Sequence, residues 1–397
     1  MTHARMWVGA VVVIGLLGVL GLSGSLKRGV GIAGDDSAVK KIKCDTGQTL
    51  TDALKKAKPG DTLQVTGTCH ERVTITTDRL TLDGGGSAVL DGGGGGPTEL
   101  FEAVVIIDGV QGVTLMGFTI QNGPSLGILG VGGAAFVVKD TTVQNNGRAG
   151  IFLNNNSSAE LIDVEVKDSG GIGIPVQNNS TAVFKGHISS TGSGSNGIAV
   201  QSGSTLEIRG ASVQASSNGG NGVDIVDSQA IIFGYPESQG SILTAHNNGG
   251  DGIFVATGSL SFFGGAFAGT GSLATISASN NGGNGIAIGL DGAVVSPFGA
   301  AKFMIENNQQ RGLNVDEGGS ALIIGGLTVQ NNQTGLLADG AGTLTLVSVS
   351  SNPSSIENNT GTDVDLRFGT RVTFGGVSIG SITCDATVLS RGTTVCP

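Results

Sequence analysis

The sequence is poor in charged, aromatic and proline residues. Charged residues make up 13% of the 397 residues and aromatic residues 4%, with 8 prolines, one tryptophan and one tyrosine. Because 39% of the residues are hydrophobic, this low charge excludes intrinsic disorder for the bulk of the chain. The 71 glycines follow no three-residue period, which excludes collagen. The net charge of −10 gives no support for a nucleic-acid-binding surface, so no nucleic-acid partner is expected.

The N-terminal segment is an uncharged, strongly apolar stretch. No charged residue occurs in Met6–Leu26, and the small residues Ser23-Gly24-Ser25 lie near its end. This pattern is typical of a secretory signal peptide, and its length also suits an uncleaved membrane anchor. We predict that residues 1–33 make the protein extracytoplasmic, either secreted or tethered by this segment. Contact with a membrane is expected only through it.

The four cysteines all follow this segment, in two widely separated pairs. Cys44 and Cys69 lie near the start of the remaining chain, and Cys384 and Cys396 lie at its end. An even count in an exported protein favours two local disulfides, each closing a short loop. The alternative is a single metal site made of all four thiolates, which would require the two ends of an elongated chain to meet.

A glycine followed by an aliphatic residue recurs along the chain. The steps begin at Gly127, Gly150, Gly173, Gly197, Gly222, Gly252, Gly285, Gly312 and Gly335. Successive positions are 23, 23, 24, 25, 30, 33, 27 and 23 residues apart, and Asp363-Val364 continues the series without the glycine. A repeat of this length with drift is typical of a solenoid.

Within each repeat, apolar residues alternate at a period of two, which indicates short strands. One alternate position is almost purely aliphatic and is expected to point inward; it holds Leu153, Val176, Val200, Ile225, Val255, Ile288 and Val315. Three short strands per repeat predict a parallel β-helix of about 11 coils, spaced roughly 4.8 Å apart. A recurring Asn-Asn step ends the third strand, and we expect its side-chain amides to stack into a ladder.

One short stretch has helical rather than strand periodicity. Leu50, Ala53, Leu54 and Ala57 recur at helical spacing, and Pro59-Gly60 ends the run. An amphipathic helix here would cover the open end of the solenoid, where strand edges are otherwise unpaired. The expected organisation is therefore a cap with a short helix and the first strand in residues 34–72, a β-helix in 73–383, and a disulfide-closed tail in 384–397.

The entry segment also resembles a known family. Residues Leu50–Leu63, Val73–Ile75 and Leu80–Gly84 are similar to the capping helix and first coil of the right-handed parallel β-helix proteins of the pectin-lyase-like superfamily, and the Gly-Ile and Asn-Asn steps are similar to its coils. The resemblance implies an all-β, right-handed, single-stranded parallel β-helix. It leaves activity open, because members include lyases, hydrolases, epimerases, tailspikes and adhesins. The Asn-Thr-Asp and Gly-His-Gly motifs of the hydrolases are missing, and Gly186-His187-Ile188 is the nearest approach to the second.

Stacking brings residues one coil apart into proximity and predicts a first candidate site. Asp316, Asp339 and Arg367 occupy one outward row near the C-terminal end, and Asp365 stands beside Arg367. Carboxylates about 5 Å apart need a proton, a cation or the guanidinium between them. These four residues are candidates for catalysis, and the resemblance implies that such a cluster holds Ca²⁺ and a uronate. The structural interpretation is an exposed ion-pair ladder.

A second outward row follows the second strand. On successive coils it holds Lys139, Asp163, Lys185, Arg209, Phe233 and Phe263. We predict that Asp163, Lys185, Arg209 and Phe263 form a candidate substrate-binding surface, with Phe supplying the aromatic rings for sugar stacking. The alternative is that opposite charges on neighbouring coils neutralise one another and serve only the fold.

Two functional hypotheses follow. The first is an exported surface or adhesin-like protein that binds extracellular polysaccharide without a conventional active site and needs no cofactor. The second is a polysaccharide lyase or epimerase that acts on a uronate-containing polymer through Asp316, Asp339, Asp365 and Arg367. Ca²⁺ is a possible cofactor only under this second hypothesis. The net charge of −10 disfavours an acidic polymer unless a cation bridges it.

Overall fold

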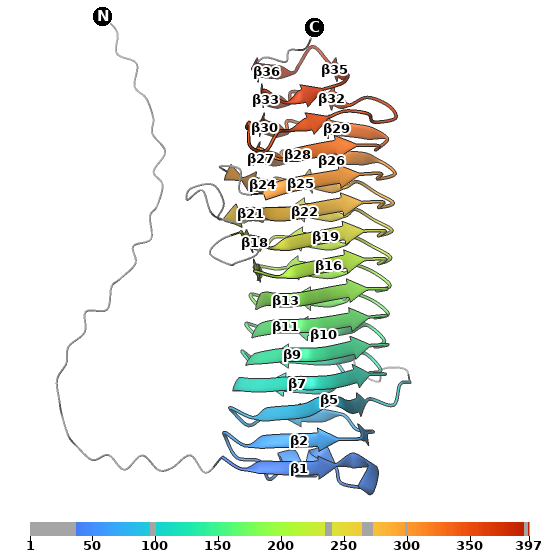
Figure 1. Cartoon of the computed structure of the whole chain (residues 1–397), viewed down its shortest axis with the longest axis vertical. Coiled ribbons are helices and arrows are strands. Elements are labelled where there is room, and N and C mark those ends of the chain that lie inside the picture. The colour runs from blue at the N-terminus through green and yellow to red at the C-terminus, as the bar shows by residue number, and fades with distance from the viewer. Residues whose placement is uncertain are drawn as a thin grey trace, which may run out of the picture. The chain divides into compact units, whose positions relative to one another are not determined.

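The strands of this protein wind into a stack of coils built from two sheets (Figure 1). The structure is a computed structural model that describes residues 37–95, 101–234, 240–263, 273–297, 301–392 and 396. Internal contacts divide the chain into residues 1–35 and 36–397, and all described residues belong to the second unit. The predicted export segment lies outside the described residues. Among the described residues, no helix is long and apolar enough to cross a membrane.

Sheet B contains 13 strands, one above another, and every register pairing between them is parallel. Its strands are β4 (Val73–Ile75), β6 (Ala103–Asp108), β8 (Leu126–Val131), β10 (Ala149–Leu153), β12 (Ile174–Val176), β14 (Ile198–Gln201), β17 (Val223–Val226), β20 (Ile253–Ala256), β23 (Ile286–Gly289), β26 (Arg311–Val315), β29 (Thr334–Ala338), β32 (Val364–Leu366) and β35 (Ile382–Cys384). The sequence predicted about 11 coils, so the strand stack is slightly taller than expected.

Sheet A contains 23 strands and supplies the other two sides of each coil. In the first coils it has β1 (Val39–Lys43), β2 (Thr62–Thr66), β3 (Thr68–Cys69), and the long strands β5 (Thr81–Asp91), β7 (Gln111–Gln121), β9 (Ala135–Gln144), β11 (Ser158–Lys167) and β13 (Thr181–Thr191). Later coils have two separate strands. The first of each pair is β15 (Thr205–Arg209), β18 (Gln229–Phe233), β21 (Ser259–Phe263), β24 (Ala293–Ser296), β27 (Ser320–Ile324), β30 (Thr343–Val347), β33 (Arg371–Gly375) and β36 (Leu389–Gly392). The second is β16 (Ser212–Ser216), β19 (Ile242–His246), β22 (Ala274–Ser279), β25 (Ala301–Glu306), β28 (Leu327–Gln330), β31 (Ser355–Ile356) and β34 (Ser378–Ile379).

The predicted coil register is confirmed. Val200 lies opposite Val176 on one side and Ile225 on the other, and Val315 lies opposite Ile288. The whole predicted inward column is buried with 0% exposure: Leu153, Val176, Val200, Ile225, Val255, Ile288 and Val315. Each of these side chains packs on like residues above and below, so the aliphatic core is continuous along the stack.

A ladder of asparagine amides runs inside one corner of the coils, as predicted. Each side-chain nitrogen donates to the amide oxygen of the next coil over 2.9–3.1 Å, along Asn218, Asn248, Asn281, Asn308, Asn332 and Asn359. The repeated glycine makes room for it, because a Cβ at Gly252 would lie 2.7 Å from Nδ2 of Asn281 and 2.6 Å from the Gly285 carbonyl oxygen.

The ladder ends at Asp363, which takes the glycine position of its coil. Its Oδ1 accepts from Nδ2 of Asn359 over 2.9 Å, and its Oδ2 accepts from the Ser381 hydroxyl over 2.9 Å. Burial raises the pKa of Asp363, but the hydrogen bonds from Asn359 and Ser381 outweigh it, so this pKa lies below the usual value. An ionised carboxylate thus accepts the last amide protons of the ladder.

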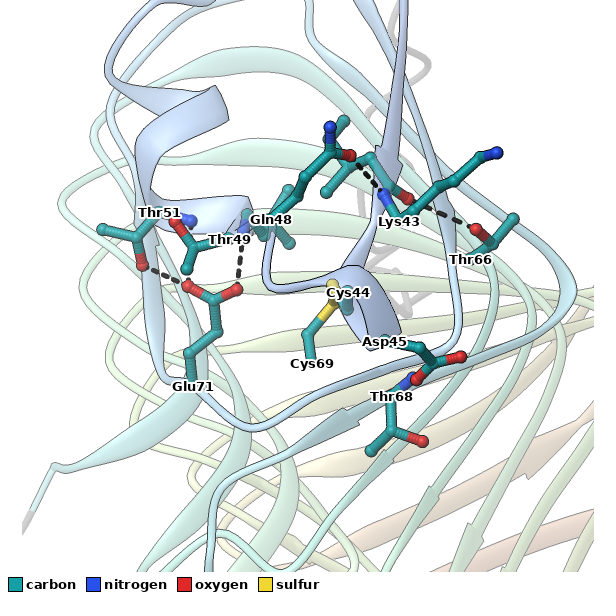
Figure 2. Close-up of a disulfide and its surroundings, with 12 residues drawn as sticks. Lys43, Cys44, Asp45, Gln48, Thr49, Thr51, Thr66, Thr68, Cys69 and Glu71 are labelled. Atoms are coloured by element: carbon teal, nitrogen blue, oxygen red, sulfur yellow. Dashed lines mark hydrogen bonds between the residues drawn. A yellow bond between two sulfur atoms is a disulfide. The ribbon is translucent and has the colours of Figure 1, made fainter.

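The N-terminal end carries a short 3₁₀ helix, η1 (Cys44–Thr46), and a helix, α1 (Leu50–Leu54). The helix starts where predicted but ends before Ala57. Glu71 accepts hydrogen bonds from the backbone N–H groups of Leu50 (2.6 Å) and Thr51 (2.9 Å), and thereby caps α1 (Figure 2). Both predicted disulfides are confirmed, Cys44–Cys69 beside this cap and Cys384–Cys396 at the C-terminal end.

Hydrogen bonds to Asp61 hold the first coil together and make the stability of the N-terminal end of the β-helix depend on pH. Its carboxylate is 1% exposed and accepts hydrogen bonds from the Lys40 ammonium and from the N–H groups of Lys58 (2.8 Å) and Ala38 (2.9 Å). The Lys40 bond foremost, then the two backbone bonds, hold the pKa of Asp61 far below its usual range. Because the pKa of Asp61 is lower in the folded protein than the value of about 4 in the unfolded chain, ionised Asp61 stabilises the fold above about pH 4. This stabilisation is lost as the pH falls.

We therefore expect the wild-type free energy of unfolding to fall more steeply between about pH 5 and 2 than that of Asp61→Asn. Urea unfolding at a series of pH values measures both slopes. Equal slopes for the two proteins would show that Asp61 has no such role.

Candidate functional site

The C-terminal acidic row is assembled as the sequence predicted. Asp316 follows β26, Asp339 follows β29 and Arg367 follows β32, and these strands lie side by side in sheet B. The Asp339 N–H donates to the carbonyl oxygen of Val315 over 2.9 Å, and the Arg367 N–H donates to that of Ala338 over 2.9 Å. The three side chains therefore start from neighbouring coils on one face.

Within this row, the guanidinium of Arg367 is directed at Asp365. Its Nε donates to Oδ1 over 3.0 Å, and a terminal nitrogen donates to Oδ2. Asp365 is the main cause of a raised pKa for Arg367, and Asp339 and Asp385 add to it. In the part of the chain that the structure describes, the only three cysteine, histidine or carboxylate groups close enough to share a metal ion are Cys44, Cys69 and Glu71, of which the cysteines form a disulfide. Among the described residues, the ion pair of this row joins Arg367 to Asp365, and neither Asp316 nor Asp339 takes part in an ion pair.

The second predicted row is wrong for Asp163. Lys139 and Lys185 both lie opposite Ile162, one residue before Asp163. Asp163 has φ 53° at the bend of β11, where its Oδ1 accepts from the N–H of His187 over 2.9 Å. The left-handed bend turns this carboxylate to a corner of the coil, out of the row. Lys185 pairs instead with a carboxylate on the same sheet face, that of Glu160, over 2.9 Å.

The other members of this row stack along the coils. The guanidinium carbon of Arg209 lies 4.1 Å from the centre of the Phe233 ring, and Phe233 and Phe263 have ring centres 6.1 Å apart with planes 27° from parallel. Register places Arg209 and Phe263 on opposite sides of Phe233. Both faces of the Phe233 ring are therefore occupied by the protein, and Phe263, 53% exposed, is the outermost ring of the stack.

The outward row of sheet B, whose first coils line a groove, was not predicted from the sequence. The row consists of Leu129, Phe152, Pro175, Ala199, Asp224, Phe254, Ala287, Asn314, Leu337 and Asp365. Although they point outward, Phe152 is only 7% exposed and Asn314 only 5%. The row was not apparent in the sequence because its residue types change from coil to coil, and only register joins them.

This groove is mostly apolar. Phe152 packs with Ala103, Leu126, Leu129 and Ala149 in a hydrophobic cluster separate from the core. Beside it lies a cavity of about 240 Å³, lined by Leu126, Arg148, Ala149, Phe152, Gly171, Ile172, Pro175, Gln177 and Ser195. A concave, mostly apolar site with a few polar groups is the usual form of a ligand-binding site.

Beyond the groove the row is mixed: the polar side chains of Asp224, Asn314 and Asp365 are interspersed with Phe254, Ala287 and Leu337. Asp224, 6% exposed, accepts from Nε2 of Gln201 over 2.7 Å and from Nδ2 of Asn221 over 3.0 Å. Burial raises the pKa of Asp251, and the negative charge of Asp316 adds to the rise. The row is thus purely apolar near Phe152 and carries acceptor groups among its apolar side chains from Asp224 onward.

Comparison with known proteins supports the fold. The family model described as right handed beta helix region matches residues 100–235. No curated protein sequence matches the chain significantly.

Solved structures of similar shape include three enzymes. An alginate lyase from Paenibacillus sp. is 15% identical over 89% of this chain and 99% of that chain, with a TM-score of 0.38. A mannuronan C-5 epimerase A-module from Azotobacter vinelandii is 14% identical over 87% of this chain and 94% of that chain, with a TM-score of 0.38. A pectin methylesterase from Erwinia chrysanthemi is 12% identical over 67% of this chain and 94% of that chain, with a TM-score of 0.35. The family match over residues 100–235 agrees with the stacked parallel strands and supports the predicted right-handed parallel β-helix fold, while membership of the pectin-lyase-like superfamily stays a resemblance.

Proposed function

We propose that this protein is an exported, surface or adhesin-like β-helix protein that binds extracellular polysaccharide in the groove of sheet B, without a conventional active site. The observation that carries the proposal is the cavity of about 240 Å³ beside Phe152 and Pro175. Flat apolar side chains suit the C–H faces of sugar rings, and Gln177 and Ser195 at the same cavity supply groups for hydroxyls. The two disulfides support an oxidising compartment outside the cytoplasm.

The second hypothesis, a lyase or epimerase acting on a uronate polymer with Ca²⁺, has less support. It requires Asp365 and Arg367 to face a substrate, whereas each already has the other as its ion-pair partner. The net charge of −10 also repels a polyuronate in the absence of a bridging cation.

Phe152→Ala is expected to weaken retention on the bound polysaccharide by about tenfold, because a lost aromatic contact of about 1.4 kcal/mol corresponds to that factor. Affinity electrophoresis in gels containing each of a panel of neutral, uronate and amino polysaccharides measures it. Phe152→Leu keeps an apolar side chain at this position and separates loss of the ring from loss of packing.

Ile242→Ala is the control, because Ile242 is an exposed apolar residue on sheet A that lies outside the groove and outside the candidate rows. It should retain wild-type binding. Equal losses from Phe152→Ala and Ile242→Ala, or retention on no polymer of the panel, would contradict the proposed function. Product release from any polymer would favour the enzyme hypothesis.

A further inference from the structure

Gln177 lines the cavity beside Phe152 and has one amide atom without a partner. Its Nε2 donates to Oε1 of Gln201 on the next coil over 2.8 Å. No described residue donates to Oε1 of Gln177, and this atom is not one of the fully buried atoms that lack a partner. The side chain is half-buried, so a ligand in the cavity can reach this oxygen.

The orientation of this amide is determined by Asp224, two coils away and thus at a distance of about 10 Å along the stack. Nε2 of Gln201 donates to Oδ2 of Asp224 over 2.7 Å, so Oε1 of Gln201 is the atom that faces Gln177. An ionised carboxylate only accepts, so Gln201 cannot turn round without facing its own oxygen to Asp224. Gln177 cannot turn round either, because its oxygen would then face the oxygen of Gln201. We call these three side chains the amide relay.

A main-chain group anchors the far end of the amide relay. Oδ1 of Asn221 accepts from the N–H of Asp251 over 2.8 Å, so Nδ2 of Asn221 faces Asp224 and donates to its Oδ1 over 3.0 Å. A main-chain N–H can only donate, and it therefore sets the direction of every hydrogen bond from Asn221 to Gln177. The atom of Gln177 that is left for the cavity is thus an oxygen, which accepts and does not donate.

We propose that Asp224 is a positioning residue for the cavity, and that the amide relay selects a neutral hexose over a uronate. The inference rests on the proposed function and specifies its ligand. The exocyclic carbon 6 extends furthest from a sugar ring that packs on Phe152; its hydroxyl in a hexose donates to Oε1 of Gln177, whereas its carboxylate in a uronate only accepts and is repelled. The Ser195 hydroxyl at the same cavity donates or accepts and does not discriminate, and Arg148 there already has an interaction of its own.

The test compares matched neutral and uronate hexasaccharides of the gluco, manno and galacto series, by isothermal titration calorimetry at neutral pH. Salt at about 1 M shortens the screening length to about 3 Å, so the net charge of the protein contributes little. In the series that binds, we expect wild type to hold the neutral hexasaccharide about tenfold more tightly than its uronate counterpart.

Asp224→Asn should reverse the amide relay. Asn221 stays fixed by the main chain and donates to the oxygen of the new amide, so the NH₂ group of that amide faces Gln201. Gln201 and Gln177 then both turn round, and Gln177 presents its Nε2 to the cavity. Every hydrogen bond of the relay is kept, so the melting temperature should stay close to that of wild type. The preference for the neutral hexasaccharide should nevertheless be lost.

Asp227→Asn is the matched control, because it removes a carboxylate from the same coil that makes none of the relay's hydrogen bonds. Asp227 is exposed and has φ 51°, a conformation that asparagine tolerates well, so this variant should keep the preference of about tenfold. Gln177→Ala removes the atom that meets the ligand. In that background Asp224→Asn should not change the preference further, because both residues act through one chain of hydrogen bonds.

Equal affinity of wild type for the neutral and uronate hexasaccharides would overturn the inference, as would a preference that survives in Asp224→Asn. An equal loss in Asp227→Asn would also overturn it, because charge alone would then explain the preference, and so would an effect of Asp224→Asn that persists without Gln177. Binding of none of the hexasaccharides would overturn it too. In all these cases, polymer retention that depends on Phe152 leaves the proposed function standing. If no polymer of the panel is retained either, the proposed function fails and the inference fails with it.

Discussion

Asn281→Ala is expected to lower the free energy of unfolding by about 4 kcal/mol, because the buried groups it leaves unpaired cost about 1–3 kcal/mol each. Asn281 is 0% exposed and lies in the middle of the amide ladder. Its Oδ1 accepts from the N–H of Asn248 (3.1 Å) and from Nδ2 of Asn248 (3.0 Å). Its Nδ2 donates to Oδ1 of Asn308 (2.9 Å) and to the Ala245 carbonyl oxygen (3.1 Å). Alanine keeps the backbone and removes all four bonds.

Urea unfolding followed by circular dichroism measures this loss. The control is Ser277→Ala, on the half-buried outer face of β22, the strand that precedes Asn281, which should change the stability by less than about 0.5 kcal/mol. A loss of under about 1 kcal/mol in Asn281→Ala would mean that the corner amides contribute little.

Removal of the Cys44–Cys69 disulfide should be the second large effect, with a loss of about 3.5 kcal/mol. The bond spans 25 residues, and without it the unfolded chain gains the corresponding loop entropy. It also holds β3, and hence the neighbouring Glu71, against the first coil, so its loss weakens the carboxylate cap of α1 (Figure 2). The double variant Cys44→Ser/Cys69→Ser is compared with wild type in urea.

The second disulfide is the internal reference for this prediction. Cys384–Cys396 spans 12 residues, and loop length alone makes its contribution about 0.6 kcal/mol smaller. A larger loss from Cys384→Ser/Cys396→Ser than from the N-terminal pair would contradict the role given to the α1 cap.

The fold was predictable because its strongest constraints repeat. Each coil needs an aliphatic residue at the inward position and a glycine at the corner where an amide enters, and both recur visibly. Coils without the Gly-aliphatic step were harder to count. Strands β4, β6 and β35 belong to sheet B but carry no such step, which explains why the sequence predicted fewer coils than sheet B has strands.

The candidate sites were less predictable, because they depend on single residues at bends. Asp163 was assigned to the row of Lys185, whereas the register puts Ile162 opposite Lys185 and leaves Asp163 one residue later, at the left-handed corner where β13 has one residue more than β11. The row of Asp316, Asp339 and Arg367 was placed correctly because it directly follows the regular strands of sheet B. Its role in catalysis stays a prediction.

The amide ladder also divides the protein mechanically. From Asn218 to Asp363 its corner is fully hydrogen-bonded from coil to coil, but in the preceding coils the same corner holds Asn146, Ser169 and Ser193, each with a side-chain atom that has no partner among the described residues. Under tension along the stack, coils that lack the amide ladder should separate before coils that have it. Force applied along the stack should therefore separate the coils near Ser169 first, beside the cavity at Phe152, and leave the coils from Asn218 onward intact.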